Sequence, residues 1–137
     1  MLTSHLLAEA YNDIFCKIAP SPIHGVGVFA IKEIPPNTVI FRRSIEWEDL
    51  DKKFLDRIDS NVALLYRELL LDTKDNIKIR VPTKGFSSLD ISFYVNHSII
   101  PTAKYDIDNN FIVSSTKINI GDEITFNYKV FGHAGIF

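Results

Sequence analysis

The hydrophobic positions of the chain follow two different periods. Short runs in which apolar and polar residues alternate are separated by turns rich in proline, glycine and asparagine, and they cover residues 14–18, 28–31, 39–45, 77–81, 111–114 and 123–126. Alternation with a period of two is typical of half-buried β-strands. The Pro/Gly turn PSPIHGVG between the first two runs predicts a hairpin.

The middle of the chain has a helical period instead. Between residues 46 and 72, apolar residues recur at spacings of three and four, as in Leu55 and Ile58 or Val62, Leu65 and Leu69. Ser60 and Asn61 divide this stretch as cap-type residues. A second, short helix is expected over residues 3–11. Together the patterns predict an α+β fold that is mainly β, with a helical insertion at about 46–72.

The stretch FYVNHSIIP interrupts the pattern. Ile91, Phe93 and Val95 alternate like a strand, but three polar residues, Asn96 to Ser98, follow before apolar residues return. On residue types alone, Asn96 and Ser98 would cap a turn that a proline closes, and the histidine between them would be structural.

Two further stretches contain residues of chemical interest. HGVGVF, residues 24–29, has a G-x-G that would allow positive φ or close backbone approach, but it lacks the third glycine of a dinucleotide-binding loop. IGDEITFNY, residues 120–128, predicts a turn, a strand and a tyrosine that could be an ordinary edge aromatic. Each stretch alone is explained by ordinary structure.

Length and composition fit one soluble domain spanning residues 1–137. Of 137 residues, 46% are hydrophobic and 23% are charged, which is a globular composition with enough residues to bury a core. No apolar run approaches the roughly 20 residues of a membrane span, and the N-terminus lacks the pattern of a signal peptide. We therefore expect no membrane association.

The net charge and the cysteine content limit which binding partners and which cellular compartment are expected. The net charge of -2 gives no general attraction for nucleic acid, so no direct nucleic-acid binding is expected. The single cysteine, Cys16, excludes an internal disulfide and any all-cysteine zinc cluster made by this chain alone. It favours an intracellular, reducing compartment, cytoplasm or nucleus.

In combination, the three stretches resemble the SET-domain protein lysine methyltransferases. GxGVF near the N-terminus, NHSxxP in the second half and GDEITFNY near the C-terminus occur in the order and spacing of that family, over about residues 15–131. The resemblance implies a β-clip fold: several small curved sheets around a knot-like crossing, where the C-terminal segment passes under a preceding loop. Residues 46–72 would be a variable insertion that shapes the substrate groove.

The resemblance also implies a reaction. Methyl groups would pass from S-adenosylmethionine to a lysine side chain of a protein substrate, such as a histone or another basic protein, without a metal. Tyr128 would be the catalytic tyrosine, and Tyr105 and Phe126 would line the substrate channel. The donor would be bound by His24, Gly25, Val26, Gly27, Asn96 and His97.

The chain departs from the family pattern at several positions. The segment before NHS is FYV, where the family usually has an arginine, Ile99 replaces a cysteine, and Thr102 and Asn127 replace residues that are common in relatives. No cysteine cluster follows Tyr128, so a zinc-bound tail that completes the lysine channel is not expected. The tail 129–137, with Phe131, Ile136 and Phe137, could then fold over the site, as could a second subunit of a homodimer, or the tail could simply pack against the domain.

Two other classes of function are kept open. The chain could be a catalytically silent SET-like module that binds a protein or peptide, or an interaction domain whose leucine-rich residues 62–71 form the partner surface. Binding of S-adenosylmethionine would separate the interaction domain from the other two, and methyl transfer would separate enzyme from silent module.

Overall fold

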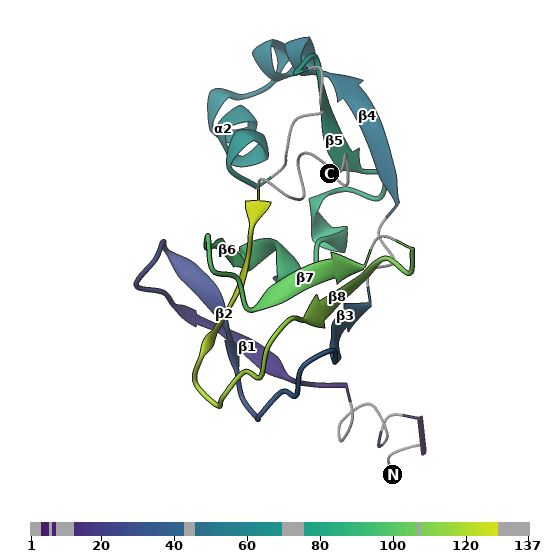
Figure 1. The fold of residues 1–137 in the computed structure, drawn as a ribbon. Coiled ribbons are helices and arrows are strands. Elements are labelled where there is room, and N and C mark those ends of the chain that lie inside the picture. The colour runs from purple at the N-terminus through teal and green to yellow at the C-terminus, as the bar shows by residue number, and fades with distance from the viewer. Residues whose placement is uncertain are drawn as a thin grey trace. The chain divides into compact units, whose positions relative to one another are not determined.

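Short strands dominate the chain (Figure 1). The computed structural model describes residues 4–5, 7, 13–42, 46–69, 76–106 and 108–128. The strands are β1 (Cys16–Pro20), β2 (Val26–Ala30), β3 (Val39–Arg42), β4 (Trp47–Asp51), β5 (Lys78–Pro82), β6 (Asn96–His97), β7 (Ala103–Asp106), β8 (Phe111–Ser114) and β9 (Glu123–Phe126). The helical elements are α2 (Ser60–Leu69) and the 3-10 helices η1 (Lys52–Arg57), η2 (Phe86–Ser88) and η3 (Ile91–Tyr94).

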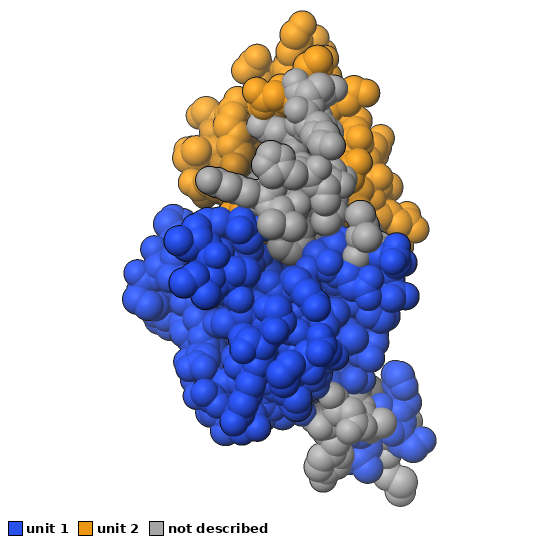
Figure 2. Space-filling view, viewed as in Figure 1, with its two compact units in different colours: residues 1–43, 94–127 blue, residues 44–93, 128–137 orange. Residues whose placement is uncertain are grey.

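These strands form sheets of four, three and two strands, which confirms the predicted mainly β class. The chain divides into two compact units (Figure 2). The first unit contains residues 1–43 and 94–127, and the second contains residues 44–93 and 128–137. Neither is a continuous stretch of sequence.

The four-stranded sheet of the first unit has the order β1-β2-β9-β6. β1 and β2 form the predicted hairpin, and β9 pairs antiparallel with β2. β6 pairs with β9 in parallel, with Asn96 opposite Thr125 and His97 opposite Phe126. Strand β9 therefore joins the N-terminal hairpin to the NHS segment, although all three are far apart in sequence.

Strand β9 is also held by the loop that leaves β6. The Ser98 amide donates to the Phe126 carbonyl at 2.8 Å, and Thr102, at the far end of the loop, bonds to Thr125. The chain from Asn96 to Thr102 therefore bends around β9. These contacts bring together the two segments that the SET resemblance expects at the crossing.

The core of the first unit is aliphatic. The other sheet of this unit has the order β3-β8-β7, and Ile34 and Ile118 form an isolated bridge between the loops. The fully buried aliphatic side chains described in this unit are Val28, Ile34, Val95, Ile112, Ile118 and Ile124. Each contributes about 1.5–3 kcal/mol on burial, so this core fixes the strands that carry the G-x-G, NHS and GDEITF stretches.

The core of the second unit is mainly aromatic. β4 and β5 form an antiparallel pair, and Ile79 and Val81 of β5 are buried beneath Trp47, Leu50, Phe54, Tyr66, Phe86 and Phe93. The Tyr66 and Phe86 rings pack edge to face, with their centroids 4.5 Å apart. Such pairs contribute about 0.5–1.5 kcal/mol beyond the burial of their area.

The predicted helix over residues 46–72 is wrong at its start. Residues 47–51 form strand β4, η1 follows, and α2 begins at Ser60. The helical spacing that begins at Leu55 and Ile58 does not extend back to residues 47–51, where five residue pairs between β4 and β5 decide the local structure. The cap of α2 is Asp59, whose Oδ1 accepts from the Asn61 amide at 2.9 Å, in place of the predicted Ser60 or Asn61.

The predicted strand over residues 91–95 is also wrong, because residues 91–94 form the 3-10 helix η3. Asp90 starts this helix: its Oδ1 accepts from the Ser92 amide at 2.9 Å, and its carbonyl accepts from the Phe93 amide. This local capping overrides the alternating pattern. The predicted helix 3–11 lies largely outside the described residues, as does the tail 129–137.

Candidate functional site

The hairpin turn between β1 and β2 presents backbone carbonyls. The Ser21 amide donates to the Gly25 carbonyl at 2.9 Å, which closes the turn that contains His24. Gly25 has φ of +48°, in the left-handed region, and a Cβ there would meet nothing within 4 Å. This glycine is therefore needed for backbone conformation and not for space.

Asn96 extends from β6 to these carbonyls. The residue is only 8% exposed, and its Nδ2 lies 3.0 Å from the Val26 carbonyl and 3.2 Å from the His24 carbonyl. Two of the predicted donor-binding elements, the turn and the NHS segment, thus meet in one place. The two carbonyls converge on one donor nitrogen, that of the Asn96 side chain. An ammonium group, which only donates, requires acceptors grouped in this way.

Glu123 completes this cluster, and the sequence did not point to it. Its Oε2 accepts from Asn96 Nδ2 at 2.8 Å, and the Ser21 hydroxyl donates to Oε1 and Oε2 at 2.8 and 2.9 Å. Ser21 also lies 3.1 Å from Asn96 Nδ2. We call these three residues the Ser21–Asn96–Glu123 cluster.

The second glycine of G-x-G has a different role from the first. A Cβ on Gly27 would overlap the Glu123 carboxylate and would lie 3.1 Å from Asn96 Nδ2. Gly27 is therefore needed because two side chains pack directly against the backbone. The groups that pack closely against Gly27 belong to the chain itself, and the predicted approach of this backbone to a ligand stays a prediction.

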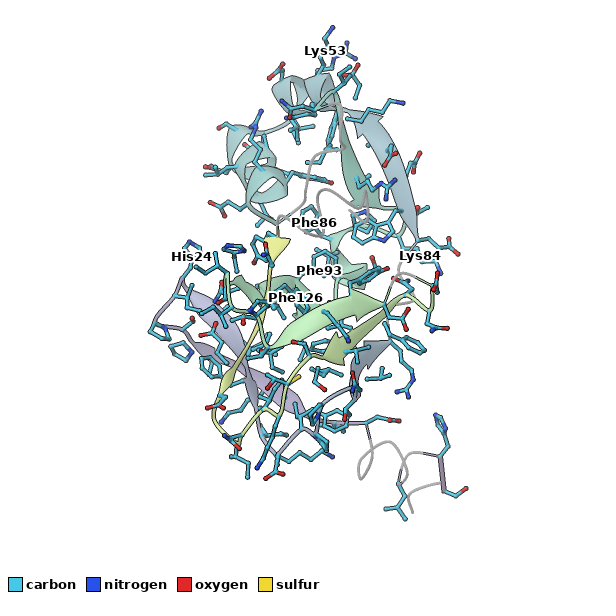
Figure 3. All side chains as sticks on the ribbon, viewed as in Figure 1. His24, Lys53, Lys84, Phe86, Phe93 and Phe126 are labelled. Atoms are coloured by element: carbon cyan, nitrogen blue, oxygen red, sulfur yellow. The ribbon has the colours of Figure 1, made fainter. Side chains whose placement is uncertain are left out.

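The remaining donor-binding candidate is His97. Its side chain is half-buried, and the residue pairs with Phe126 across the parallel β6–β9 ladder. His24 is exposed at the hairpin turn, and Phe126 lies on β9 (Figure 3). Phe126 is 4% exposed, so its ring is part of the packed interior of the first unit.

The two predicted tyrosines are placed differently. The Tyr105 hydroxyl, on β7, donates to Asn110 Oδ1 in the β7–β8 turn, where Asn110 has φ of +57°. Tyr128 follows the end of β9 by two residues, is 40% exposed and belongs to the second unit. Tyr105 thus has a local partner that supports its hairpin, and this is compatible with its predicted place as a channel residue.

The thiol of the one cysteine, Cys16, is not ionised at neutral pH. Burial raises the pKa of the Cys16 thiol on β1 to about 11, so it is protonated at neutral pH. Among the described residues, no group of three His, Cys, Asp or Glu side chains could hold a metal ion. No helix in the described ranges is long and apolar enough to cross a membrane.

Comparison with known proteins identifies the family. The SET domain model matches residues 25–129, which is most of the chain. The chain therefore belongs to the SET-domain family. No curated protein is significantly similar to it.

Solved structures share the fold. A Plasmodium falciparum protein, named as a proposed histone methyltransferase, has 22% identity and a TM-score of 0.51, over 85% of this chain and 94% of that one. A humanized mutant of the Chaetomium thermophilum Polycomb Repressive Complex 2, bound to an inhibitor, has 19% identity and a TM-score of 0.51, covering 85% of this chain. ctPRC2 bound to S-adenosylmethionine in an autoinhibited conformation has 17% identity and a TM-score of 0.55, covering 91% of this chain.

This chain spans only 15% and 16% of the two Polycomb chains, so the likeness concerns a small part of each. At these identities it shows the fold. One of these neighbours is named as a proposed histone methyltransferase, and another was solved with S-adenosylmethionine bound.

The Ser21–Asn96–Glu123 cluster fits the amino-acid end of that ligand. Asn96 is buried, and all the hydrogen bonds of its side chain to described residues involve Nδ2. No described residue donates a hydrogen bond to Oδ1. A buried acceptor without a donor costs about 1–3 kcal/mol. The amide oxygen and the two carbonyls are therefore suited to the ammonium of a methionine group.

Proposed function

We propose that the protein is an S-adenosylmethionine-dependent protein lysine N-methyltransferase. The observation that carries the proposal is the convergence of the His24 and Val26 carbonyls on the buried Asn96 amide, within a chain of the SET family. The acceptor would be a lysine of a histone or another basic protein. The chain would act as a single SET domain in which residues 46–72 are the insertion that shapes the substrate groove.

In this function the first unit binds the donor. The carbonyls of His24 and Val26 hold its ammonium, Gly25 and Gly27 allow the turn and the close packing, and the Asn96 side chain orients the methionine end. The His97 backbone contacts the adenine. When bound, S-adenosylmethionine supplies an electrophilic methyl group on a positively charged sulfur.

The residues of the channel act on the lysine. A free lysine has a pKa of about 10.4, so presenting the neutral amine at pH 7 costs about 4.6 kcal/mol in water. A dry, aromatic channel beside a positive charge lowers the lysine pKa by desolvation and by repulsion of like charge. Tyr105 and Phe126 line this channel in the proposal, and no carboxylate or histidine base is required.

Tyr128 orients the lysine amine. Its hydroxyl accepts or donates a hydrogen bond at the reacting nitrogen, so that the lone pair points along the line of displacement. With an ordinary pKa near 10, a tyrosine is a poor base at neutral pH, so orientation is its role. Closure of the site falls to the tail 129–137 or to a second subunit in a homodimer.

The first experiment is transfer of labelled methyl groups from S-adenosylmethionine to a mixture of histones and ribosomal proteins. Wild type and Tyr128→Phe are compared, and donor binding by both is measured by calorimetry. Labelling by the wild type that collapses in the variant, with donor binding retained, supports the enzyme and its catalytic tyrosine. Donor binding without transfer to any acceptor supports the silent binding module instead.

A different candidate function rests on the surface of α2. Val62 and Leu65, three residues apart on one face of the helix, are 44% and 42% exposed, and Leu64 is 53% exposed. If the chain binds no S-adenosylmethionine, this surface makes an interaction domain the better description.

A further inference from the structure

The charge of Glu123 has no cationic partner in the part of the chain that the structure describes. Its carboxylate is half-buried on β9, and none of the ion pairs between described residues involves it. Its partners are the neutral Ser21 hydroxyl and Asn96 amide. A carboxylate in such a place, next to two carbonyls, creates a negative potential that favours a bound cation.

Glu123 acts together with the His24 and Val26 carbonyls in orienting the Asn96 amide, and its contact is the shortest and the only charged one of the three. An ionised carboxylate only accepts hydrogen bonds, so it must face the NH₂ end of the amide and not the oxygen end. The 2.8 Å contact between Oε2 and Nδ2 has this orientation. Asn96 Oδ1 is consequently turned away from Glu123 and is left to accept from a ligand.

Ser21 fixes the carboxylate in turn. Its hydroxyl bonds to both oxygens of Glu123, from a position 102 residues away in sequence. The same oxygen accepts from the Ile23 amide at 3.0 Å, which ties the serine to the hairpin turn that carries the His24 carbonyl. The turn, the carboxylate and the amide are therefore one connected hydrogen-bonded unit.

We propose that Glu123, held by Ser21, is a positioning residue for the methionine end of the methyl donor: it aims Asn96 Oδ1 at the donor's ammonium and adds negative charge to that subsite. This inference rests on the proposed function. It goes beyond the family resemblance, from which neither Ser21 nor Glu123 received a role.

The test compares two ligands that differ by one group. S-adenosylhomocysteine carries the ammonium, and its desamino analogue lacks it while keeping the neutral sulfur and the adenosine. Dissociation constants for both are measured by calorimetry with wild type, Glu123→Gln, Ser21→Ala and the control Glu33→Gln. Glu33 is an exposed residue that loses the same charge, in the same unit, from a pair with Lys117.

Glutamine keeps the shape of Glu123 but can donate to Asn96 Oδ1, so it removes the charge and the part of the constraint on the amide that Glu123 supplies, while the two carbonyls remain. The preference is the ratio of the dissociation constant of the desamino analogue to that of S-adenosylhomocysteine. We expect this ratio to be about tenfold or more lower in Glu123→Gln than in the wild type, which is the effect of losing a hydrogen bond to a charged group. In Ser21→Ala the preference falls less, and in Glu33→Gln it stays within about twofold, since an exposed charge is screened by solvent and salt.

The possible results distinguish failure of the inference about Glu123 from failure of the proposed function. If Glu123→Gln weakens both ligands equally, or leaves the preference unchanged, Glu123 is only structural and the inference is overturned. If Glu123→Gln does not fold, by circular dichroism and thermal melting, the preference measured with Ser21→Ala decides in the same way. If the folded wild type binds neither ligand, the proposed function itself fails, and the inference fails with it.

Discussion

Thr102 and Thr125 hold each other's backbone. The Thr102 amide donates to Thr125 Oγ1 at 3.2 Å, and the Thr125 amide donates to Thr102 Oγ1 at 3.0 Å. Thr125 is 5% exposed and lies opposite Asn96 in the parallel pair. This reciprocal clasp joins the loop after NHS to β9 and so maintains the position of the Asn96 side chain.

Removing the clasp should destabilise the first unit. Valine has nearly the shape of threonine, so Thr125→Val deletes the hydroxyl and leaves the Thr102 amide without its partner, at a cost of about 1–3 kcal/mol. Urea denaturation should show a lower midpoint with an unchanged slope. Thr116→Val, at an exposed loop position, is the control and should change the stability by less than about 0.5 kcal/mol. Equal stability of Thr125→Val and wild type would show that the clasp contributes nothing.

The two glycines of G-x-G should respond differently to alanine. Gly25→Ala places a Cβ in open space at positive φ, so it should cost about 1–2 kcal/mol in stability. Gly27→Ala drives a methyl group into the Glu123 carboxylate and against Asn96, so it should also abolish donor binding. Thermal melting and calorimetry measure both effects.

A second substitution tests whether the clash is the cause. Gly27→Ala combined with Glu123→Ala frees the space, so the double variant should recover melting temperature relative to Gly27→Ala alone. Such non-additivity is expected of residues in direct contact. If the double variant is simply less stable by the sum of the two single effects, the close packing of Glu123 on Gly27 is not what requires glycine.

How far the sequence could predict this structure depends on the range of the interactions. β1, β2, β8 and β9 follow from local alternation, and the positive φ of Gly25 is a local property of the turn. β4 could not be predicted, because its structure depends on pairing with β5 across the intervening helical segment.

The site follows the same rule. Asn96 and the G-x-G were found because they belong to recognisable stretches. The role of Ser21 arises only when the fold brings Glu123 to it from 102 residues away. A serine flanked by prolines, and a glutamate after a Gly-Asp turn, are ordinary in sequence.

Cys16 should react slowly with alkylating reagents. Burial raises the pKa of the Cys16 thiol from 9.0 to about 11. Below pH 9, the thiolate fraction is therefore about one hundredth of the fraction that a thiol with the ordinary pKa would have. The rate of modification by iodoacetamide, followed by mass spectrometry, should therefore keep rising between pH 9 and pH 11. The chain unfolded in guanidinium provides the comparison and should level off at lower pH. A folded-state rate that already levels off near pH 9 would contradict the raised pKa.

The bond between Tyr105 and Asn110 should support the β7–β8 hairpin. Tyr105→Phe removes the hydroxyl and should cost about 0.5–1.5 kcal/mol in stability. Asn110→Gly removes the acceptor but keeps a residue that tolerates the φ of +57°. In a double-mutant cycle measured by urea denaturation, the two losses should not add. Strict additivity would mean that the hydroxyl serves another partner, such as the lysine channel.

Phe126 should influence how many methyl groups a lysine can receive. In the proposed channel, phenylalanine leaves the volume that a tyrosine hydroxyl and its bound water would occupy, so the wild type should add more than one methyl group. Phe126→Tyr should restrict the product to monomethyllysine while the first transfer continues. Mass spectra of the acceptor at saturation distinguish these products. Because Phe126 is buried, the melting temperature of the variant must be compared with that of the wild type. A wild type that stops at one methyl group would show that Phe126 leaves no usable room.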